Sequence, residues 1–136
     1  MNTLSLLILE DDPAHIEAIR RAFESADSVV EIRLATSFQS YFEQVADRRP
    51  DIVLMDLNLP DGNAQEALNL LSENNPFPVL VMTSNGNEAV AVAAMKAGAL
   101  DYVVKSPETF AGMPDSVQRV LREWHSLQDI KRASAQ

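Results

Sequence analysis

The sequence predicts an α/β protein with a central parallel five-stranded sheet and helices between the strands. Two observations support this fold class. Short apolar runs alternate along the chain with stretches of helical periodicity, which is typical of repeated strand-helix units. The chain has 136 residues, 46% of them hydrophobic, which fits one domain with one sizeable core.

The expected strands are short, and polar or turn-forming residues bound most of them. Several read as nearly continuous apolar runs, as expected for strands covered by helices on both faces. They are Ser5 to Leu9, Val29 to Ala35, Ile52 to Met55, Val79 to Thr83 and Asp101 to Val104.

The first helix is expected to begin at Pro13, because proline is favourable as a first helical residue. Asp12 stands in the capping position directly before it. Ile16, Ile19 and Phe23 then form one apolar stripe, so this face should pack on the sheet.

Three further helices have clear boundary signals. The second ends before Arg48-Arg49-Pro50, two cations favoured by the helix dipole and then a proline that stops the helix. The third follows the turn Pro60-Asp61-Gly62 with Asn63 as its cap, and the fourth is capped by Asn87 and stops at Gly98. These helices are expected at Phe38 to Ala46, Asn63 to about Glu73, and Asn87 to Gly98.

The last helix is expected from near Asp115 to about Arg132, and its apolar pattern outlasts the domain. At 1.5 Å per residue it would be roughly 27 Å long, more than a sheet of short strands needs for cover. We assign Val117 to Leu121 to the core, whereas Trp124 to Ile130 either fold back locally or form a dimer or interdomain seam. The expected division is a domain over residues 1–122 and a helix extension over 123–136.

Charge and composition exclude several functions. The formal net charge of −9 opposes phosphate backbones, and no block of Lys or Arg offers a surface for nucleic acid or anionic membrane. Cysteine is absent, which excludes disulfides and thiolate chemistry. No segment reads as a signal peptide or is long enough to span a bilayer, so no membrane insertion and a cytoplasmic location are expected.

Acidic residues close two of the apolar runs. Glu10, Asp11 and Asp12 follow the first expected strand, and Asp56 follows the third. If these strands are adjacent and parallel, the carboxylates meet at the sheet edge where open α/β sheets place their ligands. Two carboxylates about 4 Å apart repel by roughly 4 kcal/mol at an effective dielectric of about 20, so a bound cation is expected.

Two more polar side chains belong to the same edge. The fourth strand ends in Thr83, and Lys105 follows the fifth. Carboxylates, a hydroxyl and an ammonium are what a phosphoryl group on Asp56 would require, with Asp56 as nucleophile and Lys105 neutralising charge. Mg²⁺ prefers oxygen ligands, and Asp11, Asp56 and one backbone carbonyl would suffice to bind it.

Four segments together resemble the receiver domain of two-component response regulators. They are Leu7-Ile8-Leu9-Glu10-Asp11-Asp12, Asp51-Ile52-Val53-Leu54-Met55-Asp56-Leu57-Asn58-Leu59-Pro60, Val79-Leu80-Val81-Met82-Thr83-Ser84, and Gly98-Ala99-Leu100-Asp101-Tyr102-Val103-Val104-Lys105. Each motif is weak alone, but their order and spacing are specific, and they cover Leu4 to about Arg122.

The resemblance implies a flavodoxin-like (βα)5 fold with strand order 2-1-3-4-5 and phosphorylation of Asp56 by a histidine kinase or histidine phosphotransfer protein. It implies Mg²⁺ held by Asp11, by Asp56, by Glu10 through water, and by the backbone carbonyl of Asn58. Switch roles follow for Thr83 and Tyr102, with Lys105 as a catalytic group. Such a protein is no enzyme beyond its own phosphorylation and dephosphorylation, and a homodimer could form through the fourth and fifth helices or the final helix.

Two departures from the family pattern concern loops. In the family a proline usually follows the lysine, often after a cis bond, whereas here Ser106 intervenes before Pro107. A cis Lys-Ser bond would cost about 3 kcal/mol, so we expect a trans bond and a reshaped loop. The glycine common at the start of the third helix is replaced by Ala64.

Every residue singled out also has an ordinary structural interpretation. Capping is the better one for Asp12, while Asp56 could cap a turn through Asn58. The others could be a strand residue, a solvated side chain, a packed ring and two surface or packing histidines: Thr83, Lys105, Tyr102, His15 and His125.

The residues argue against two other classes of protein and leave a third open. A haloacid-dehalogenase-type phosphatase would need a second acid two residues after Asp56, where Asn58 stands. A nucleotide or flavin binder would need a phosphate loop after the first strand, where acids would repel the phosphate. A receiver-shaped interaction module that acts without phosphorylation remains the alternative.

Overall fold

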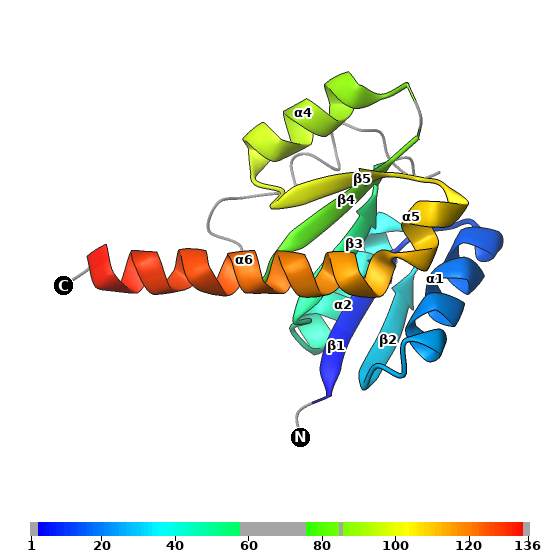
Figure 1. Cartoon of the computed structure of the whole chain (residues 1–136), viewed down its shortest axis with the longest axis horizontal. Helices are drawn as coiled ribbons and strands as arrows, with labels where there is room; N and C mark the ends of the chain where they lie inside the picture. Colours follow the sequence, from blue (N-terminus) through cyan, green and yellow to red (C-terminus); the bar gives the residue numbers. More distant parts are fainter. Residues whose placement is uncertain (1–2, 58–75, 85, 135–136) are drawn as a thin grey trace.

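The structure, a computed structural model, describes residues 3–57, 76–84 and 86–134. Five strands form one sheet in the order β2-β1-β3-β4-β5, and every neighbouring pair is parallel (Figure 1). This confirms the predicted fold class and strand order. The strands are β1 (Leu4–Leu9), β2 (Val30–Ala35), β3 (Ile52–Asp56), β4 (Val79–Thr83) and β5 (Asp101–Val104).

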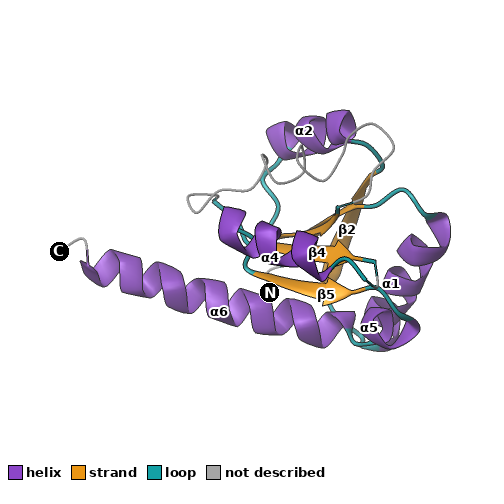
Figure 2. Ribbon diagram, turned by 90° about the horizontal axis from the view of Figure 1, so that it is seen from above, coloured by secondary structure: helices purple, strands orange, loops and turns teal. Residues whose placement is uncertain are grey.

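Helices cover both faces of the sheet (Figure 2). One face carries α2 and α4, and the other carries α1, α5 and α6. The expected third helix, Asn63 to about Glu73, lies outside the described residues, together with its turn and Ala64. The described helices are α1 (Pro13–Ser25), α2 (Phe38–Asp47), α4 (Glu88–Ala97), α5 (Pro107–Ala111) and α6 (Met113–Ser134).

The sheet separates two hydrophobic cores. On β1, Leu7 and Leu9 face the core under α2 and α4, while Leu6 and Ile8 face the core under α1, α5 and α6. Because side chains alternate between faces along a strand, only a continuous apolar run can fill both cores. This explains why β1, β3 and β4 look like buried strands in the sequence.

The helix caps were predicted with mixed success. The side chain of Asp12 accepts a hydrogen bond from the N–H of Ala14 at 2.9 Å, which confirms its capping role. Asn87 stands at the N-cap position of α4, as predicted, but its side chain makes no capping hydrogen bond. The backbone carbonyl of Asn87 accepts from the N–H groups of Val90 and Ala91 instead.

The backbone carbonyl groups at the end of α2 accept hydrogen bonds from an arginine that lies outside the helix. Arg33, on β2, donates to the carbonyl oxygens of Gln44 at 3.0 Å and Arg48 at 2.7 Å. The expected cation at the end of the helix, Arg48, has extended backbone just past it and pairs with Glu31 on β2. The end of α2 is therefore tied to the neighbouring strand rather than stabilised by its own basic residues.

The chain after β5 forms a short helix that the sequence analysis did not predict. The hydroxyl of Ser106 accepts from the N–H of Thr109 at 3.0 Å, and Pro107 is the first residue of α5. None of the described peptide bonds is cis, which confirms the expected trans bond between Lys105 and Ser106. The predicted start of α6 at Asp115 was two residues late, because Pro114 is tolerated in the first turn of a helix.

The long helix α6 packs on the domain only over its first half. Val117, Val120 and Leu121 are buried, as predicted, whereas Leu127 is 40% and Ile130 61% exposed. Figure 1 shows the second half projecting beyond the sheet. Trp124 lies between the two halves and lines two surface hollows of about 390 Å³ and 300 Å³. Among the described residues, no helix combines the length and apolar character needed to cross a membrane.

Candidate functional site

Three carboxylates meet at the carboxyl ends of β1 and β3. Leu9 is in register with Met55, so Glu10 and Asp56, the next residue on each strand, are neighbours across the sheet. One carboxylate oxygen from each of Glu10, Asp11 and Asp56 lies within 4.8 Å of the others. Glu10 is fully buried and Asp56 is 3% exposed, whereas Asp11 is exposed. We call these three residues the acid cluster.

Glu10 is held by hydrogen bonds to both of its carboxylate oxygens. Its Oε2 atom accepts from the backbone N–H groups of Asp11 at 2.9 Å and Asp12 at 3.1 Å. Its Oε1 atom lies 2.7 Å from Nζ of Lys105. A buried carboxylate needs such partners, because an unpaired buried charge is strongly destabilising.

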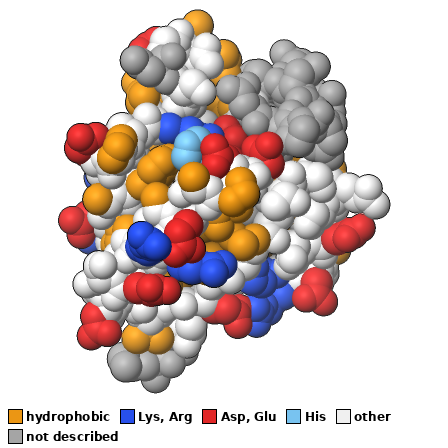
Figure 3. Space-filling view, turned by 90° about the vertical axis from the view of Figure 1, so that its right-hand side faces the viewer, with side chains coloured by type: hydrophobic (Ala, Val, Ile, Leu, Met, Phe, Trp, Pro, Cys, Tyr) orange, Lys and Arg blue, Asp and Glu red, His pale blue; other side chains and the backbone are white. Residues whose placement is uncertain are grey.

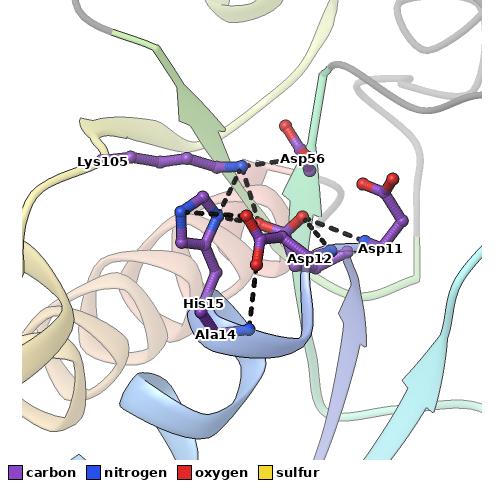
Figure 4. Close-up of polar contacts among 7 residues, drawn as sticks. Asp11, Asp12, Ala14, His15, Asp56 and Lys105 are labelled. Carbon is purple, nitrogen blue, oxygen red and sulfur yellow. Dashed lines mark hydrogen bonds and ion pairs between the residues drawn. The ribbon is translucent and has the colours of Figure 1, made fainter.

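Lys105 reaches the acid cluster from β5 (Figure 4). Its backbone N–H donates to the carbonyl of Thr83 at 2.8 Å, which continues the pairing of β5 with β4. Its Nζ atom lies 3.0 Å from Oδ2 of Asp56. The side chain is 13% exposed, so Lys105 is a partner of the acids and not a solvated lysine.

The pKa values of Glu10 and Lys105 move in opposite directions. Burial alone would raise the pKa of Glu10, but hydrogen bonding with Lys105, Asp56 and the backbone of Asp12 lowers it below its ordinary value. Burial alone would lower the pKa of Lys105, but hydrogen bonds to Glu10 and Asp56 raise it. Both shifts favour the charged forms, a buried carboxylate beside a largely covered ammonium.

Thr83 lies at the end of β4 with a buried hydroxyl group. The residue is 3% exposed, and its Oγ1 atom has no hydrogen-bond partner within the part of the chain that the structure describes. A buried polar atom without a partner is costly and uncommon in folded proteins. Its position at the same sheet edge makes Oγ1 available to a group that joins the site.

His15, on α1, also belongs to the site, although the sequence analysis assigned it to a surface or packing role. Its Nδ1 atom lies 3.3 Å from Oε1 of Glu10 and 3.4 Å from Nζ of Lys105, and its Nε2 atom lies 3.4 Å from Oδ2 of Asp12. Figure 3 shows a histidine beside acidic side chains on one face of the molecule. The missed signal was its spacing: three residues after a helix cap, His15 faces back toward that cap.

Among the other predicted residues, one lies apart from these contacts and one lies outside the described part of the chain. Tyr102 lies on β5 with 37% of its surface exposed. Asn58, whose backbone carbonyl was predicted as a metal ligand, lies outside the described residues. The other histidine, His125, is exposed on α6 and stacks edge-on against Trp124, in agreement with a surface role.

The donor set of the acid cluster fits a magnesium ion. All three side chains offer oxygen, which is the ligand type that Mg²⁺ prefers. Three carboxylates and the Lys105 ammonium together leave two negative charges, which one divalent cation would balance. Because Asp11 is exposed, the cluster is open to solvent on one side, as an ion that keeps several waters requires.

A comparison with protein families adds independent information. The family model described as the response regulator receiver domain matches residues 6–111, which is most of the chain. This range includes every residue of the acid cluster, together with His15, Thr83 and Lys105.

Curated relatives and solved structures agree with that match. The chain is 31% identical over 131 residues to the methanogenesis regulatory protein FilR1 of Methanothrix harundinacea, covering 90% of this chain and 28% of that protein. It is 38% identical over 102 residues to the photosynthetic apparatus regulatory protein RegA of Rhodobacter capsulatus, covering 74% and 54%. The receiver domain of NtrX from Brucella abortus has the same fold, with a TM-score of 0.72, 22% identity and coverage of 86% and 98%. The chain thus spans about a quarter to a half of these two curated relatives.

Proposed function

Because the chain belongs to the response regulator receiver domain family, we propose that it is a signalling module phosphorylated on Asp56 in a Mg²⁺-dependent reaction. The observation that carries this proposal is the contact between Lys105 and Asp56 inside the acid cluster. An ordinary turn-capping aspartate would need neither a buried lysine nor two further acids beside it. The expected phosphoryl donor is a histidine kinase or a histidine phosphotransfer protein.

The proposed reaction transfers one phosphoryl group to an oxygen of Asp56. As the new bond between this oxygen and phosphorus forms, the bond from phosphorus to the donor's imidazole nitrogen breaks, and its electron pair stays on that nitrogen. Such a transfer depends on placing the groups in line and on neutralising charge at the phosphoryl oxygens. The protein therefore acts as phospho-acceptor and at most catalyses its own phosphorylation and dephosphorylation.

The ligands proposed for Mg²⁺ are Asp11, Asp56, Glu10 through water, and the backbone carbonyl of Asn58. When bound, the ion supplies positive charge to the phosphoryl oxygens. Lys105 is already paired with Asp56, so its ammonium can move from the carboxylate to a phosphoryl oxygen over a short distance. Thr83 can donate its unpartnered hydroxyl to another phosphoryl oxygen.

The proposed output is a change in association with a partner or with a second copy of the chain. Moving an equilibrium from 1:99 to 99:1 takes about 5.5 kcal/mol, while one hydrogen bond to a charged group contributes about 1.5 to 3 kcal/mol. Thr83 alone is therefore insufficient, and we propose that repacking of the half-exposed Tyr102 adds to the switch. Unchanged partner affinity in Tyr102→Ala, both with and without phosphorylation, would contradict this role.

The proposed signalling module divides into two parts along the chain. We assign residues 1–122 to the receiver domain and 123–136 to an extension that acts as a dimer or interdomain connector. The exposure of Leu127 and Ile130 on α6 supports this assignment, because both side chains would be buried in such a helix interface. Comparing the oligomeric mass of the full chain with that of a version ending at Arg122, with and without a phosphate mimic, tests it.

A direct test uses acetyl phosphate as a small-molecule donor and intact-protein mass as the measurement. We expect one added phosphoryl group in the wild type with Mg²⁺, none after chelation, and none in Asp56→Asn. The alternative, a module that acts without phosphorylation, predicts no adduct under donor excess. Binding of beryllofluoride that persists in Asp56→Asn would also favour that alternative.

A further inference from the structure

The three N–H groups of the Lys105 ammonium have three neighbouring acceptors. Nζ lies 2.7 Å from Oε1 of Glu10, 3.0 Å from Oδ2 of Asp56 and 3.4 Å from Nδ1 of His15. Glu10 and Asp56 belong to the proposed phosphorylation chemistry, whereas His15 has no part in it. The role of the third acceptor is therefore unassigned.

The contact between His15 and Lys105 requires one particular tautomer of the imidazole. An ammonium only donates, so Nδ1 of His15 can bond to it only through a lone pair. The ring hydrogen then sits on Nε2, which lies 3.4 Å from Oδ2 of Asp12, an atom that only accepts. In the opposite tautomer Nδ1 donates to Glu10, and Lys105 loses its third acceptor.

The ring of His15 is also held from the side. Its centroid lies 5.1 Å from that of Phe110 on α5, with a tilt of 39° between the rings. Phe110 is 6% exposed and belongs to the hydrophobic core under α1 and α6. The imidazole is thus fixed by a packed ring on one side and by Asp12, which itself caps α1, on the other.

From this geometry we propose that His15 is a positioning residue for Lys105. Through Nδ1 it holds the ammonium at the junction of Glu10 and Asp56, and Asp12 holds His15 in the tautomer that this requires. With two acceptors alone, the four-carbon lysine side chain would have one N–H free to turn toward solvent. The inference rests on the proposed function only for its consequence for phosphorylation, because the contact itself joins two side chains of the protein.

Nitrogen NMR of the imidazole tests the contact in the metal-free protein. The chain has two histidines, so a His125→Gln variant assigns the resonances of His15. We expect the ring hydrogen on Nε2 and a hydrogen-bonded Nδ1. In Lys105→Met the Nδ1 signal should move to the position of an unbonded nitrogen, while in Lys96→Met, an exposed lysine on α4, it should stay in place.

Two substitutions at His15 test the consequence. His15→Phe keeps a ring against Phe110 but removes Nδ1, whereas His15→Asn loses the ring and places a side-chain oxygen near the former Nδ1 position. Loss of one hydrogen bond to a charged group predicts an about tenfold slower phosphorylation by acetyl phosphate in His15→Phe. His15→Asn should recover most of that rate. The dissociation constant for Mg²⁺, measured by calorimetry, should be unchanged in both.

The outcomes separate a positioning role from simple packing. Equal loss of rate in both variants, a hydrogen on Nδ1 in the wild type, or an Nδ1 signal that ignores Lys105→Met would each overturn the proposal. If the wild type takes up no phosphoryl group, the proposed function fails, yet the metal-free NMR comparison still decides whether His15 accepts from Lys105.

Discussion

The Nζ atom of Lys105 lies 3.0 Å from Oδ2 of Asp56 and is almost sealed from solvent, with 13% of the side chain exposed. In this arrangement one buried cation serves two buried carboxylates, since Glu10 lies at 2.7 Å from the same nitrogen. The free energy of folding therefore depends on groups that the proposed reaction also uses. Substitutions at the site should change stability and phosphorylation in separable ways.

Lys105→Met should destabilise the metal-free protein by about 3 kcal/mol at pH 7, because Glu10 and Asp56 would remain buried without their cation. Urea denaturation measures the change. Lys96→Met, which removes an exposed lysine from the last turn of α4, is the matched control and should cost less than about 0.5 kcal/mol. Equal losses in the two variants would show that the buried pairing contributes nothing.

Asp11→Asn should remove most of the stabilisation by magnesium. At a concentration 100 times its dissociation constant, Mg²⁺ should stabilise the wild type by about 2.7 kcal/mol. Without metal, Asp11→Asn should be more stable than the wild type by about 1 kcal/mol, because one repulsive charge is gone. Thermal unfolding with and without MgCl₂ measures both effects.

The adjacent substitution Asp12→Asn is the control for Asp11→Asn. Asparagine also caps helices well, so α1 should keep its first turn and the response to Mg²⁺ should match that of the wild type. Identical magnesium responses in the two variants would rule out Asp11 as a ligand.

Thr83→Val should stabilise the free protein by about 1 kcal/mol, because a methyl group of similar size replaces a buried hydroxyl that has no partner among the described residues. The same variant should bind beryllofluoride with Mg²⁺ more weakly than the wild type. Ser5→Ala is the control, since the Ser5 hydroxyl is also buried without a partner but lies near the start of β1. It should gain stability without losing affinity for the mimic, whereas loss of affinity in both variants would point to an indirect effect.

Stability in alkali should depend on Tyr41. Burial raises the pKa of this phenol from 10.0 to about 12, so the folded state holds the proton more tightly than the unfolded chain. The corresponding stability is complete below pH 10 and is lost as pH rises through 12, with roughly 1.4 kcal/mol gone by pH 11.

Tyr41→Phe removes the loss of stability that comes from ionising the phenol. The loss of stability that comes from deprotonating Lys105, whose pKa is also raised, remains in this variant. The difference between wild type and variant in urea titrations at pH 9 and pH 11 therefore isolates the phenol. A constant difference across that range would show that the ring is not shielded from water.

Sequence analysis predicted the strand ends well because their chemistry is local. Asp56 directly follows a run of buried apolar residues. This run predicts a strand, so the carboxylate is placed at the end of that strand and therefore at the edge of the sheet. The hydroxyl of Thr83 and the ammonium of Lys105 were placed by the same argument. Their pairing could be anticipated because parallel strands end at one edge.

Contacts between distant segments were harder to predict. The ring of His15 packs against Phe110 of α5, and α5 itself was missed. Ser106 and Pro107 were interpreted as a departure from a family pattern, although a serine before a proline and Glu108 is also a helix-start signal. Asn87 shows a different limit: the residue stands at the predicted cap position, but its side chain does not make the capping bond that its type favours.

Trp124 is the sole tryptophan of the chain, and its place between the two halves of α6 makes it a built-in optical probe. The larger hollow beside it is lined by Leu4 and Asp51, at the opposite edge of the sheet from Glu10 and Asp56. Six residues of β1, roughly 20 Å, separate that indole from the reacting groups. Its fluorescence will report whether the last helix stays seated on the body of the molecule, and an emission change on adding a phosphate mimic would be a long-range signal rather than quenching at the pocket.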